Sequence, residues 1–215
     1  MKNVIIAGSG SQARYAIDIL KENPDFNIIA AVDLEAGHMV GADLNGVCVK
    51  WHISELDAHV SKQVPCCVIA HGDAKLKQKI SDDLSGRGFN FISAISRLAY
   101  VARSAKIGLG CIVNPNVTIM PNANIKDHVI IHSGCVIEHD AFIDEYANIA
   151  PGVSFGGNVS VGKRAYIYTG AAIIPKITIG NDCIVGAGAV VTKSVGAGEK
   201  VAGVPARSIS QISES

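Results

Sequence analysis

A six-residue repeat in the second half of the chain limits the possible folds more than any other feature. From Val101 to Val191, every sixth residue is large and apolar. The residue four positions further on is also apolar in every repeat, and all but Ile177 are Ala, Cys or Val. Only 48% of the residues are hydrophobic, so a match at every position is not a chance event, and a helical period of 3.6 residues does not give this spacing.

The repeat predicts an all-β left-handed parallel β-helix over residues 96–215, including the C-terminal tail. Each hexapeptide forms a short strand on one side of a three-sided prism, with the large residue in the interior and the small one near a corner. The coils stack about 4.8 Å apart into a prism about 25 Å tall. Such prisms wind left-handed, against the usual right-handed crossover. Residues expected at the corners, in left-handed backbone conformation, are Asn114, Asn116, Asn122, Asn124, Gly134, Gly152 and Gly162.

Residues 1–95 have a different pattern, in which strands alternate with helices. A strand, a Gly-rich turn and a helix cover 2–23, further strands cover 27–33 and 65–73, and a helix at 74–84 precedes a short strand at 89–95. This order predicts an α/β Rossmann-like domain with a small parallel sheet. Ligands of such sheets bind at the carboxyl ends of the strands. The residues expected around that crevice are Gly8, Ser9, Gly10, Ser11, Asp33, His71 and Gly72.

The Gly-rich turn GSGSQA matches only the first half of the dinucleotide fingerprint, because Ala13 replaces the last glycine. It is either the phosphate-binding turn of a nucleotide site or simply a tight connection from strand to helix. Because the domain is short, a nucleotide-sugar fits better than a dinucleotide, with backbone N–H groups near its phosphates. Asp33 then contacts the nucleotide or caps a helix.

The composition of the chain restricts the possible partners and location less strongly than the repeat restricts the fold. The 19 basic and 19 acidic residues balance, which favours neither nucleic acid nor an anionic membrane as a partner. No apolar run reaches the roughly 18 residues of a membrane span, and Arg14 and Asp18 follow the first strand too closely for a signal peptide. The six cysteines form no CxxC pair and are expected to be reduced and mostly buried. We therefore expect a cytoplasmic protein.

The segment VIEHD puts Glu138, His139 and Asp140 together on the repeat. A surface histidine between two acids is usually only solvated. However, Gly157 follows His139 by 18 residues, one coil, so the two are expected to stack on the same face. A glycine there can offer an unobstructed backbone N–H to an oxyanion.

The combination of this α/β domain with a hexapeptide prism carrying VIEHD, IAPG, FGGNVSVG and GVPAR resembles one family over essentially the whole chain. It is similar to the bacterial NeuD/PglD-like sugar acetyltransferases, which comprise sialic acid O-acetyltransferases and UDP-amino-sugar N-acetyltransferases. The resemblance implies acetyl transfer from acetyl-CoA to a sugar, in a homotrimer with sites between adjacent prisms. It implies that His139 is the general base, Asp140 its orienting acid and Gly157 the oxyanion donor.

The same resemblance implies a set of acetyl-CoA contacts, with the GVPAR segment closing on CoA and basic side chains meeting its phosphates. These residues are Asn148, Gly157, Gly170, Ala171, Gly188, Lys193, Pro205 and Arg207. Two positions depart from the family pattern. Asn148 stands where a second histidine is often found, and Gln12 replaces a histidine of the Gly-rich turn.

The expected function is N-acetylation of a nucleotide-linked amino sugar of the UDP-4-amino-4,6-dideoxy type, for surface glycan biosynthesis, without a metal. The alternative in the same class is O-acetylation of sialic acid or another sugar hydroxyl. A zinc hydratase on the same prism would need His128, His132 and His139 to converge, and a non-catalytic trimeric scaffold is a further alternative. Glu138 is expected to be structural or to support the residues that contact the ligands. His128 and His132 could line the same groove, but we expect them to be solvated surface residues.

Overall fold

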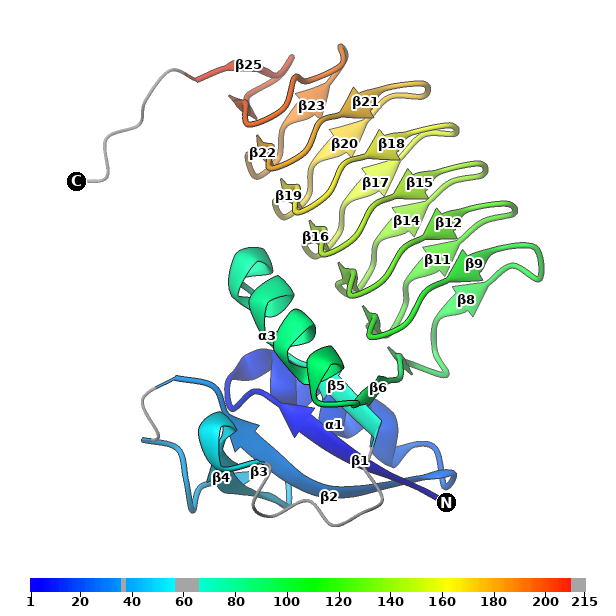
Figure 1. Cartoon of the computed structure of the whole chain (residues 1–215). Coiled ribbons are helices and arrows are strands. Elements are labelled where there is room, and N and C mark those ends of the chain that lie inside the picture. Colours follow the sequence, from blue (N-terminus) through cyan, green and yellow to red (C-terminus); the bar gives the residue numbers. More distant parts are fainter. Residues whose placement is uncertain (36–37, 57–65, 210–215) are drawn as a thin grey trace. The chain divides into compact units, whose positions relative to one another are not determined.

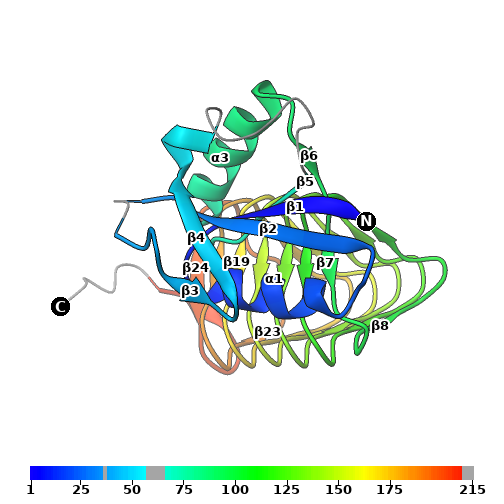
Figure 2. The same ribbon diagram turned by 90° about the horizontal axis from the view of Figure 1, so that it is seen from below.

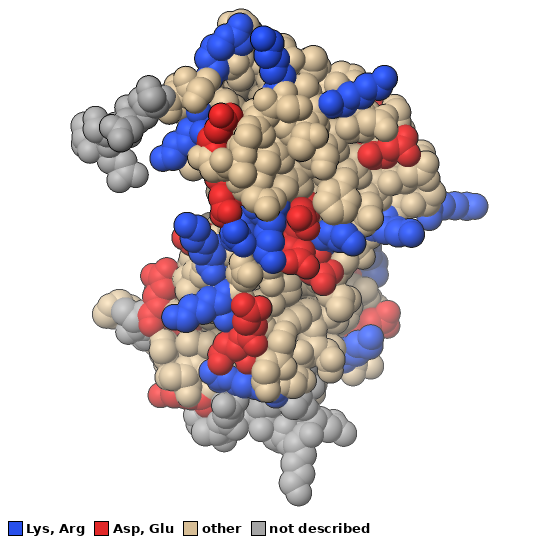
Figure 3. All heavy atoms as spheres, turned by 45° about the horizontal axis from the view of Figure 1, so that its top comes forward, with Lys and Arg blue, Asp and Glu red and all other residues tan. Residues whose placement is uncertain are grey.

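The computed structural model describes residues 1–35, 38–56 and 66–209, and the chain forms two compact units (Figure 1). The first unit comprises Met1–Arg97 with Leu109–Ile112, and the second comprises Leu98–Gly108 with Val113–Ser215. No helix among the described residues is long and apolar enough to cross a membrane. On the face shown in Figure 3, basic and acidic side chains are interspersed.

The first unit contains one sheet with the strand order β3-β4-β2-β1-β5-β6. Its strands are β1 (Lys2–Ala7), β2 (Phe26–Asp33), β3 (Asp43–Leu44), β4 (Val47–His52), β5 (Cys66–Ile69) and β6 (Asn90–Phe91). All neighbours are parallel except β3 and β4. The central strand β1 has a continuous buried run, Val4 to Ala7, as a strand covered on both faces requires. The predicted parallel strands are confirmed, but the sheet is mixed because β3 adds an antiparallel edge, and the description as Rossmann-like stays a prediction.

The helices of this unit are α1 (Ser11–Lys21), the 3-10 helix η1 (Ile53–Glu55) and α3 (Ala74–Gly86), and a short strand β7 (Ala94–Ile95) ends it. Helix α1 packs against β1 and β2 (Figure 2). It buries Ala13, Ala16, Ile17 and Leu20, the i, i+3, i+4 and i+7 spacing of one helix face. The Asp73 carboxylate caps α3 by accepting a hydrogen bond from the Leu76 N–H at 2.8 Å. Residue 65 of the predicted third strand lies outside the described residues.

The hairpin of β3 and β4 was absent from the predicted alternation. Its two-residue turn is Asn45-Gly46, with φ angles of 50° and 77°. Positive φ at both positions is typical of a type I′ turn, for which Asn-Gly is a strong sequence signal. The Asn-Gly signal was therefore present in the sequence. However, β3 is only two residues long, which is too short to show an alternating strand pattern.

The second unit is a parallel β-helix of three sheets, which confirms the prediction from the hexapeptide repeat (Figure 1). Thr118 pairs with Val136, and Val136 with Ser154, so each coil has 18 residues. The direction of winding stays a prediction. No insertion interrupts the succession of strands from β8 to β23.

The first sheet, sheet one, begins with β7 and continues with β10 (Ile112–Val113), β13 (Ile130–Ile131), β16 (Asn148–Ile149), β19 (Tyr166–Ile167), β22 (Ile184–Val185), β24 (Lys200–Ala202) and β25 (Arg207–Ser208). Sheet two contains β8 (Tyr100–Val101), β11 (Thr118–Ile119), β14 (Val136–Ile137), β17 (Ser154–Phe155), β20 (Ala172–Ile173) and β23 (Val190–Val191). Sheet three contains β9 (Lys106–Ile107), β12 (Asn124–Ile125), β15 (Phe142–Ile143), β18 (Ser160–Val161) and β21 (Thr178–Ile179).

The corners of the prism follow one rule. From Ile107 to Val185, the third residue after each large interior residue has a positive φ, between 55° and 74°. These residues are Gly110, Asn116, Asn122, His128, Gly134, Asp140, Tyr146, Gly152, Asn158, Arg164, Gly170, Lys176, Asp182 and Gly188. The predicted corners Asn116, Asn122, Gly134 and Gly152 are confirmed. Those at Asn114, Asn124 and Gly162 are wrong, because these residues lie in a strand or directly after one.

The cysteines are free thiols, as expected. Cys67, Cys111, Cys135 and Cys183 are buried, whereas Cys48 is exposed and Cys66 is half-buried. Burial raises the pKa of the Cys67 thiol to about 12 and that of Cys135 to about 11. Both therefore remain protonated and unreactive at neutral pH.

Candidate active site

His139 lies in the turn that follows β14, one residue before a left-handed corner at Asp140. Its Nδ1 is 2.8 Å from Asp140 Oδ2. A carboxylate can only accept, so Nδ1 carries the proton and Nε2 keeps its lone pair. The His139 side chain is 54% exposed and that of Asp140 44%, so the pair is open to a ligand.

The Asp140 carboxylate is held from two sides. Hydrogen bonds from His139 and from Asn122 lower its pKa below the usual value. The Asn122 Nδ2 donates to Asp140 Oδ1 at 3.1 Å. Asp140 is therefore ionised at neutral pH, as the partner of an imidazolium must be.

Gly157 lies one coil further along the prism than His139, next to the His139 ring. A Cβ added at Gly157 would overlap Nε2 and Cε1 of His139. The absence of a side chain is thus required here for the imidazole to keep its orientation.

The backbone N–H groups in the column that contains His139 and Gly157 do not form the hydrogen bonds that connect successive coils. The carbonyls in this column accept hydrogen bonds from the next position of the following coil. The donors to Pro121, His139 and Gly157 are the N–H groups of Asp140, Asn158 and Lys176. Pro121 and Pro175, one coil before His139 and one coil after Gly157, have no N–H at all. Within the described residues, the Gly157 N–H donates no hydrogen bond, so it can serve a ligand.

The other residues around the motif do not extend this site. Glu138 Oε2 accepts a hydrogen bond from the His139 N–H at 3.3 Å, in agreement with a structural role. His128 and His132 are only 4% and 8% exposed, so their prediction as solvated residues is wrong. His128 stacks on Tyr146 at 5.0 Å, and Asn114 Nδ2 lies 3.5 Å from His132 Nδ1. The part of the chain that is described holds no group of side chains suited to a metal ion.

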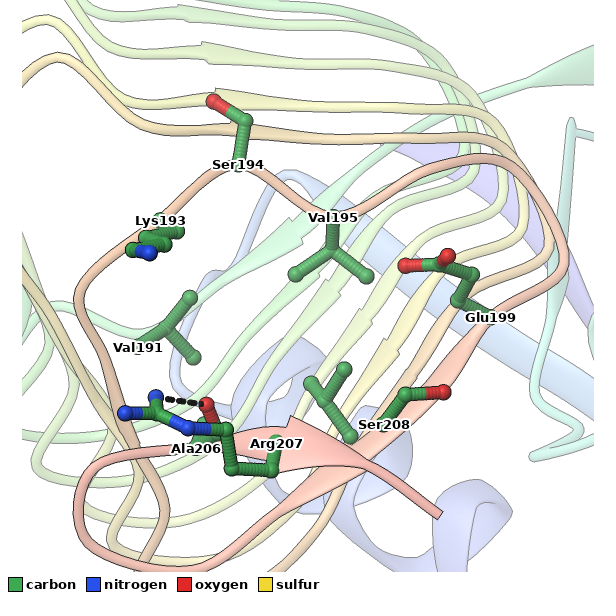
Figure 4. Close-up of a pocket in the computed structure, with 9 residues that line it drawn as sticks. Val191, Lys193, Ser194, Val195, Glu199, Ala206, Arg207 and Ser208 are labelled. Atoms are coloured by element: carbon green, nitrogen blue, oxygen red, sulfur yellow. Dashed lines mark hydrogen bonds between the residues drawn. The ribbon is translucent and has the colours of Figure 1, made fainter. Parts of the chain in front are cut away.

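Lys193 and Arg207 both line a cavity of about 230 Å³ in the last coils of the prism (Figure 4). The two basic side chains lie at the same side of this cavity, and Glu199 lies at the other. The exposed Pro205 lies in the turn before β25. The structure therefore brings together the predicted phosphate-binding residues.

Gly170 and Gly188 belong to one corner column with Gly134 and Gly152, and no atom lies within 4 Å of a Cβ built at any of the four. This bare corner leaves the backbone accessible. Ala171 is fully buried in the single chain, and its contact with CoA stays a prediction. Asn148 begins β16 on sheet one and is 1% exposed, on a different face from the strand that leads to His139. Its contact with CoA stays a prediction.

The first unit assembles the predicted crevice residues at the carboxyl ends of β1 and β2. Ser9 Oγ donates to Asp33 Oδ1 at 2.7 Å, and the Met39 N–H donates to Asp33 Oδ2 at 3.3 Å. Burial acts to raise the pKa of Asp33, but these hydrogen bonds outweigh it, and the pKa is lowered. Gly8, with φ 149°, packs so closely on the Ala70 backbone that a Cβ would overlap it. Gly10 is the N-cap residue of α1 and, having no side chain, forms no side-chain cap hydrogen bond there.

His71 and two residues that the sequence did not indicate complete this edge. His71 Nδ1 accepts from the Asp73 N–H at 3.1 Å, so Nε2 donates to Glu35 Oε1 at 3.3 Å. His52 Nε2 donates to the Glu35 carbonyl at 2.7 Å. Glu35 lies two residues after Asp33 at the end of β2, a position that could have suggested it. His52 ends β4 and could only be found once the hairpin is recognised. Gly72 follows His71, while Ser11 and Gln12 begin α1.

Comparisons with known proteins identify the family of this chain. Residues 3–84 match the PglD N-terminal domain, and residues 158–193 match the bacterial transferase hexapeptide (six repeats). The chain is similar to PerB from Caulobacter crescentus, solved in complex with CoA and GDP-perosamine, with 32% identity over 98% of both chains and a TM-score of 0.91. The chain belongs to the NeuD/PglD-like family of sugar acetyltransferases.

Other members of the NeuD/PglD-like family have similar structures. A histidine-to-alanine variant of GDP-perosamine N-acetyl transferase from Caulobacter crescentus, with CoA and GDP-perosamine, shares 31% identity over 98% of both chains, with a TM-score of 0.89. The acetyltransferase domain of PglB from Neisseria gonorrhoeae FA1090, with acetyl coenzyme A, shares 25% identity over 97% of this chain and 99% of that one, with a TM-score of 0.89. Among curated proteins, no sequence matches significantly. The resemblance stated from the motifs is thereby confirmed.

Proposed function

We propose that the chain transfers the acetyl group of acetyl-CoA to the amine of a nucleotide-linked amino sugar. The observation that carries this proposal is the His139–Asp140 pair with its free Nε2 next to the side-chain-free Gly157. Membership of the NeuD/PglD-like family supports it. Similar structures contain CoA with GDP-perosamine or acetyl coenzyme A, which are the two kinds of ligand that the reaction needs.

In the proposed mechanism, the sugar amine attacks the thioester carbonyl directly. As the C–N bond forms, the nitrogen becomes positively charged and gives a proton to His139 Nε2. Such base catalysis typically contributes about 10²–10⁴-fold. Asp140 stabilises the imidazolium that results. The C–S bond then breaks, CoA leaves as a thiolate, and the amide product remains.

The carbonyl oxygen becomes an oxyanion in the tetrahedral intermediate. The Gly157 N–H is the proposed donor to it, and a donor of this kind is typically worth about 3–4 kcal/mol of transition-state stabilisation. Gly157 thus has two roles: its missing side chain makes room for the base, and its backbone meets the charge that develops.

The remaining acetyl-CoA contacts are proposed along the prism. Lys193 and Arg207 line one cavity and suit the phosphates of CoA, with Pro205 in the segment that closes on it. Gly170 and Gly188 would receive the extended part of the cofactor at the bare corner, next to the buried Ala171. The Asn148 amide would act where family members often have a histidine.

The nucleotide-sugar is proposed to bind at the carboxyl edge of the N-terminal sheet, in a Rossmann-like manner. The uncapped N-terminus of α1, after Gly8, Ser9 and Gly10, suits the phosphates. Asp33 and His71 offer a carboxylate and an imidazole for the nucleoside. A UDP-4-amino-4,6-dideoxy-sugar remains the proposed substrate, although a similar structure contains a GDP-sugar.

We also propose a homotrimer of left-handed prisms in the cytoplasm, with each active site between adjacent prisms and a role in surface glycan biosynthesis. The exposure of His139 in the single chain supports a site that a second subunit completes.

The proposal is tested with purified protein and acetyl-CoA against UDP- and GDP-linked 4-amino sugars and free sialic acid. We expect acetylation of a nucleotide-linked amine, with the UDP-linked sugar preferred, and a loss of at least about 100-fold in kcat for His139→Ala. Turnover of sialic acid alone would instead identify an O-acetyltransferase. Unchanged activity of His139→Ala would exclude His139 as the base.

A further inference from the structure

The His139 motif is connected by hydrogen bonds to the two coils that precede it. Ser104 Oγ accepts from the Asn122 N–H at 3.1 Å. The Asn122 side chain donates through Nδ2 to Asp140 Oδ1 at 3.1 Å, and Asp140 Oδ2 accepts from His139 Nδ1 at 2.8 Å. Ser104, Asn122 and Asp140 are separated by 18 residues each, so each coil contributes one member of this column.

We propose that Asn122 is a positioning residue for the base, and this inference rests on the proposed function. The Asp140 carboxylate is 44% exposed and would otherwise rotate about its Cβ–Cγ bond. Asn122 binds one of its oxygens, so the other stays directed at His139 Nδ1. This keeps the proton on Nδ1 and leaves Nε2, the nitrogen next to Gly157, to accept the proton of the amine.

The backbone alone does not explain an asparagine at this position. Asn122 and Asp140 have φ angles of 62° and 57°, a conformation that Asn and Asp adopt more readily than most residues. However, Tyr146, Arg164 and Lys176 have the same conformation at other corners. What Asn122 provides beyond backbone geometry is an NH₂ group one coil below a carboxylate, which only Asn or Gln could supply as a neutral side chain.

Two variants test this inference. Asn122→Asp keeps the size and the tolerance for positive φ, but replaces the donor with a second negative charge. Asn122→Gly keeps the backbone conformation and removes the side chain. We expect both to lower kcat about three- to tenfold, the loss for one partly exposed hydrogen bond to a charged group, with little change in the KM for acetyl-CoA. A residue needed only for its shape would tolerate Asn122→Asp.

The pH profile separates positioning from folding. The charged side chains that contact His139 within the described residues are Asp140 and, through the His139 N–H, Glu138. Both remain in Asn122→Asp, and the added carboxylate favours the imidazolium. The acid limb of the kcat/KM profile should therefore move to higher pH. Asn116→Gly is the matched control, because Asn116 has φ 60° at a different corner. It should keep the wild-type rate and profile.

An NMR titration of the His139 ring without substrates gives a readout that does not depend on turnover. We expect its midpoint to move to higher pH in Asn122→Asp and to stay in Asn116→Gly. If the wild type acetylates no sugar of the panel, the proposed function fails while this titration still tests Asn122. Wild-type kcat together with an unchanged profile and midpoint in Asn122→Asp would overturn the inference.

Discussion

Gly157 shows how much the proposed chemistry depends on one missing side chain. Gly157→Ala would force the His139 ring away from its position, because the new Cβ overlaps Nε2 and Cε1. We expect kcat to fall about 100-fold or more, the usual effect of losing a general base, while the fold remains intact. Steady-state kinetics and thermal denaturation measure the two effects separately.

Gly196→Ala is a suitable control for that substitution. A Cβ at Gly196 would approach Glu199 no closer than 3.4 Å, and the backbone φ is not positive. It should leave both kcat and the melting temperature nearly unchanged. Equal losses in the two variants would show that any added methyl group on the prism is harmful, and the assignment of Gly157 would lose its support.

The residues of the site differ in how readily the sequence revealed them. Gly157 could be predicted to lie next to His139 because the period of a solenoid fixes which residues stack, and here one coil has 18 residues. Glu35 and His52 depend on a hairpin and on contacts between distant segments, which no local period encodes. Ala171 occupies the small repeat position, which is buried in the prism, and its contact with CoA stays a prediction.

Among the elements, the strands of the prism were predictable and its corners only partly so. The large interior residues identify each strand, because burial demands them. Asparagine suits a left-handed corner, but it is also accepted in a solvent-facing strand position, as Asn124 in β12 shows. The position of a corner is found by counting three residues beyond an interior residue. Residue type alone does not identify it.

The corner rule predicts opposite effects for two substitutions at equivalent positions. Lys176 is exposed with φ 64°, a conformation that costs a residue with a Cβ about 1 kcal/mol. Lys176→Gly should therefore raise the free energy of unfolding by about 0.5–1 kcal/mol. Gly134→Ala, with φ 74° and no atom near its Cβ, should lower it by a similar amount. Denaturant unfolding measures both, and the same sign for the two would contradict the rule.

Helix α3 carries a lysine that destabilises the fold. Lys77 is 1% exposed, its Nζ has no hydrogen-bond acceptor among the described residues, and burial lowers its pKa from 10.5 to about 7. Between pH 7 and pH 10.5 this lysine is protonated in the unfolded chain but mostly neutral in the folded protein. The free energy of unfolding should therefore rise as the pH increases from 7 toward 10.5. Lys77→Met should stabilise the protein by about 1–4 kcal/mol at pH 7.

Denaturant unfolding at pH 7 and pH 9.5 tests this prediction. The gain from Lys77→Met should be smaller at pH 9.5, because this pH lies closer to the unfolded-state pKa of 10.5 and deprotonating the buried lysine then costs less free energy. Lys75→Met, at an exposed position of the same helix, should have little effect at either pH. A gain that does not change with pH would mean that Lys77 is not destabilised by burial of its charge.

For the whole molecule, the residues on the outer surface of the prism suggest sheet two as the face that a second subunit would cover in the proposed trimer. The residues that flank the interior position on sheet two point outward: Tyr100, Ala102, Thr118, Met120, Val136, Glu138, Ser154, Gly156, Ala172, Ile174, Val190 and Thr192. Only Glu138 among them is charged, whereas sheet three presents Lys106, Lys126 and Asp144 at the equivalent positions. His139 directly follows Glu138, so a subunit bound to sheet two would adjoin the proposed base.

Ile174→Glu tests whether the trimer uses this face and whether the site needs it. Ile174 is 41% exposed in the single chain, so a glutamate there can be solvated and the isolated fold should remain stable. In a trimer that buries sheet two, the same carboxylate would lose its water without a partner, at a cost of several kcal/mol for each subunit. We expect light scattering to report monomers and kcat to fall to background, with an unchanged circular dichroism spectrum. Thr178→Glu on sheet three should remain trimeric and active, and a trimeric Ile174→Glu would assign the subunit contact to another face.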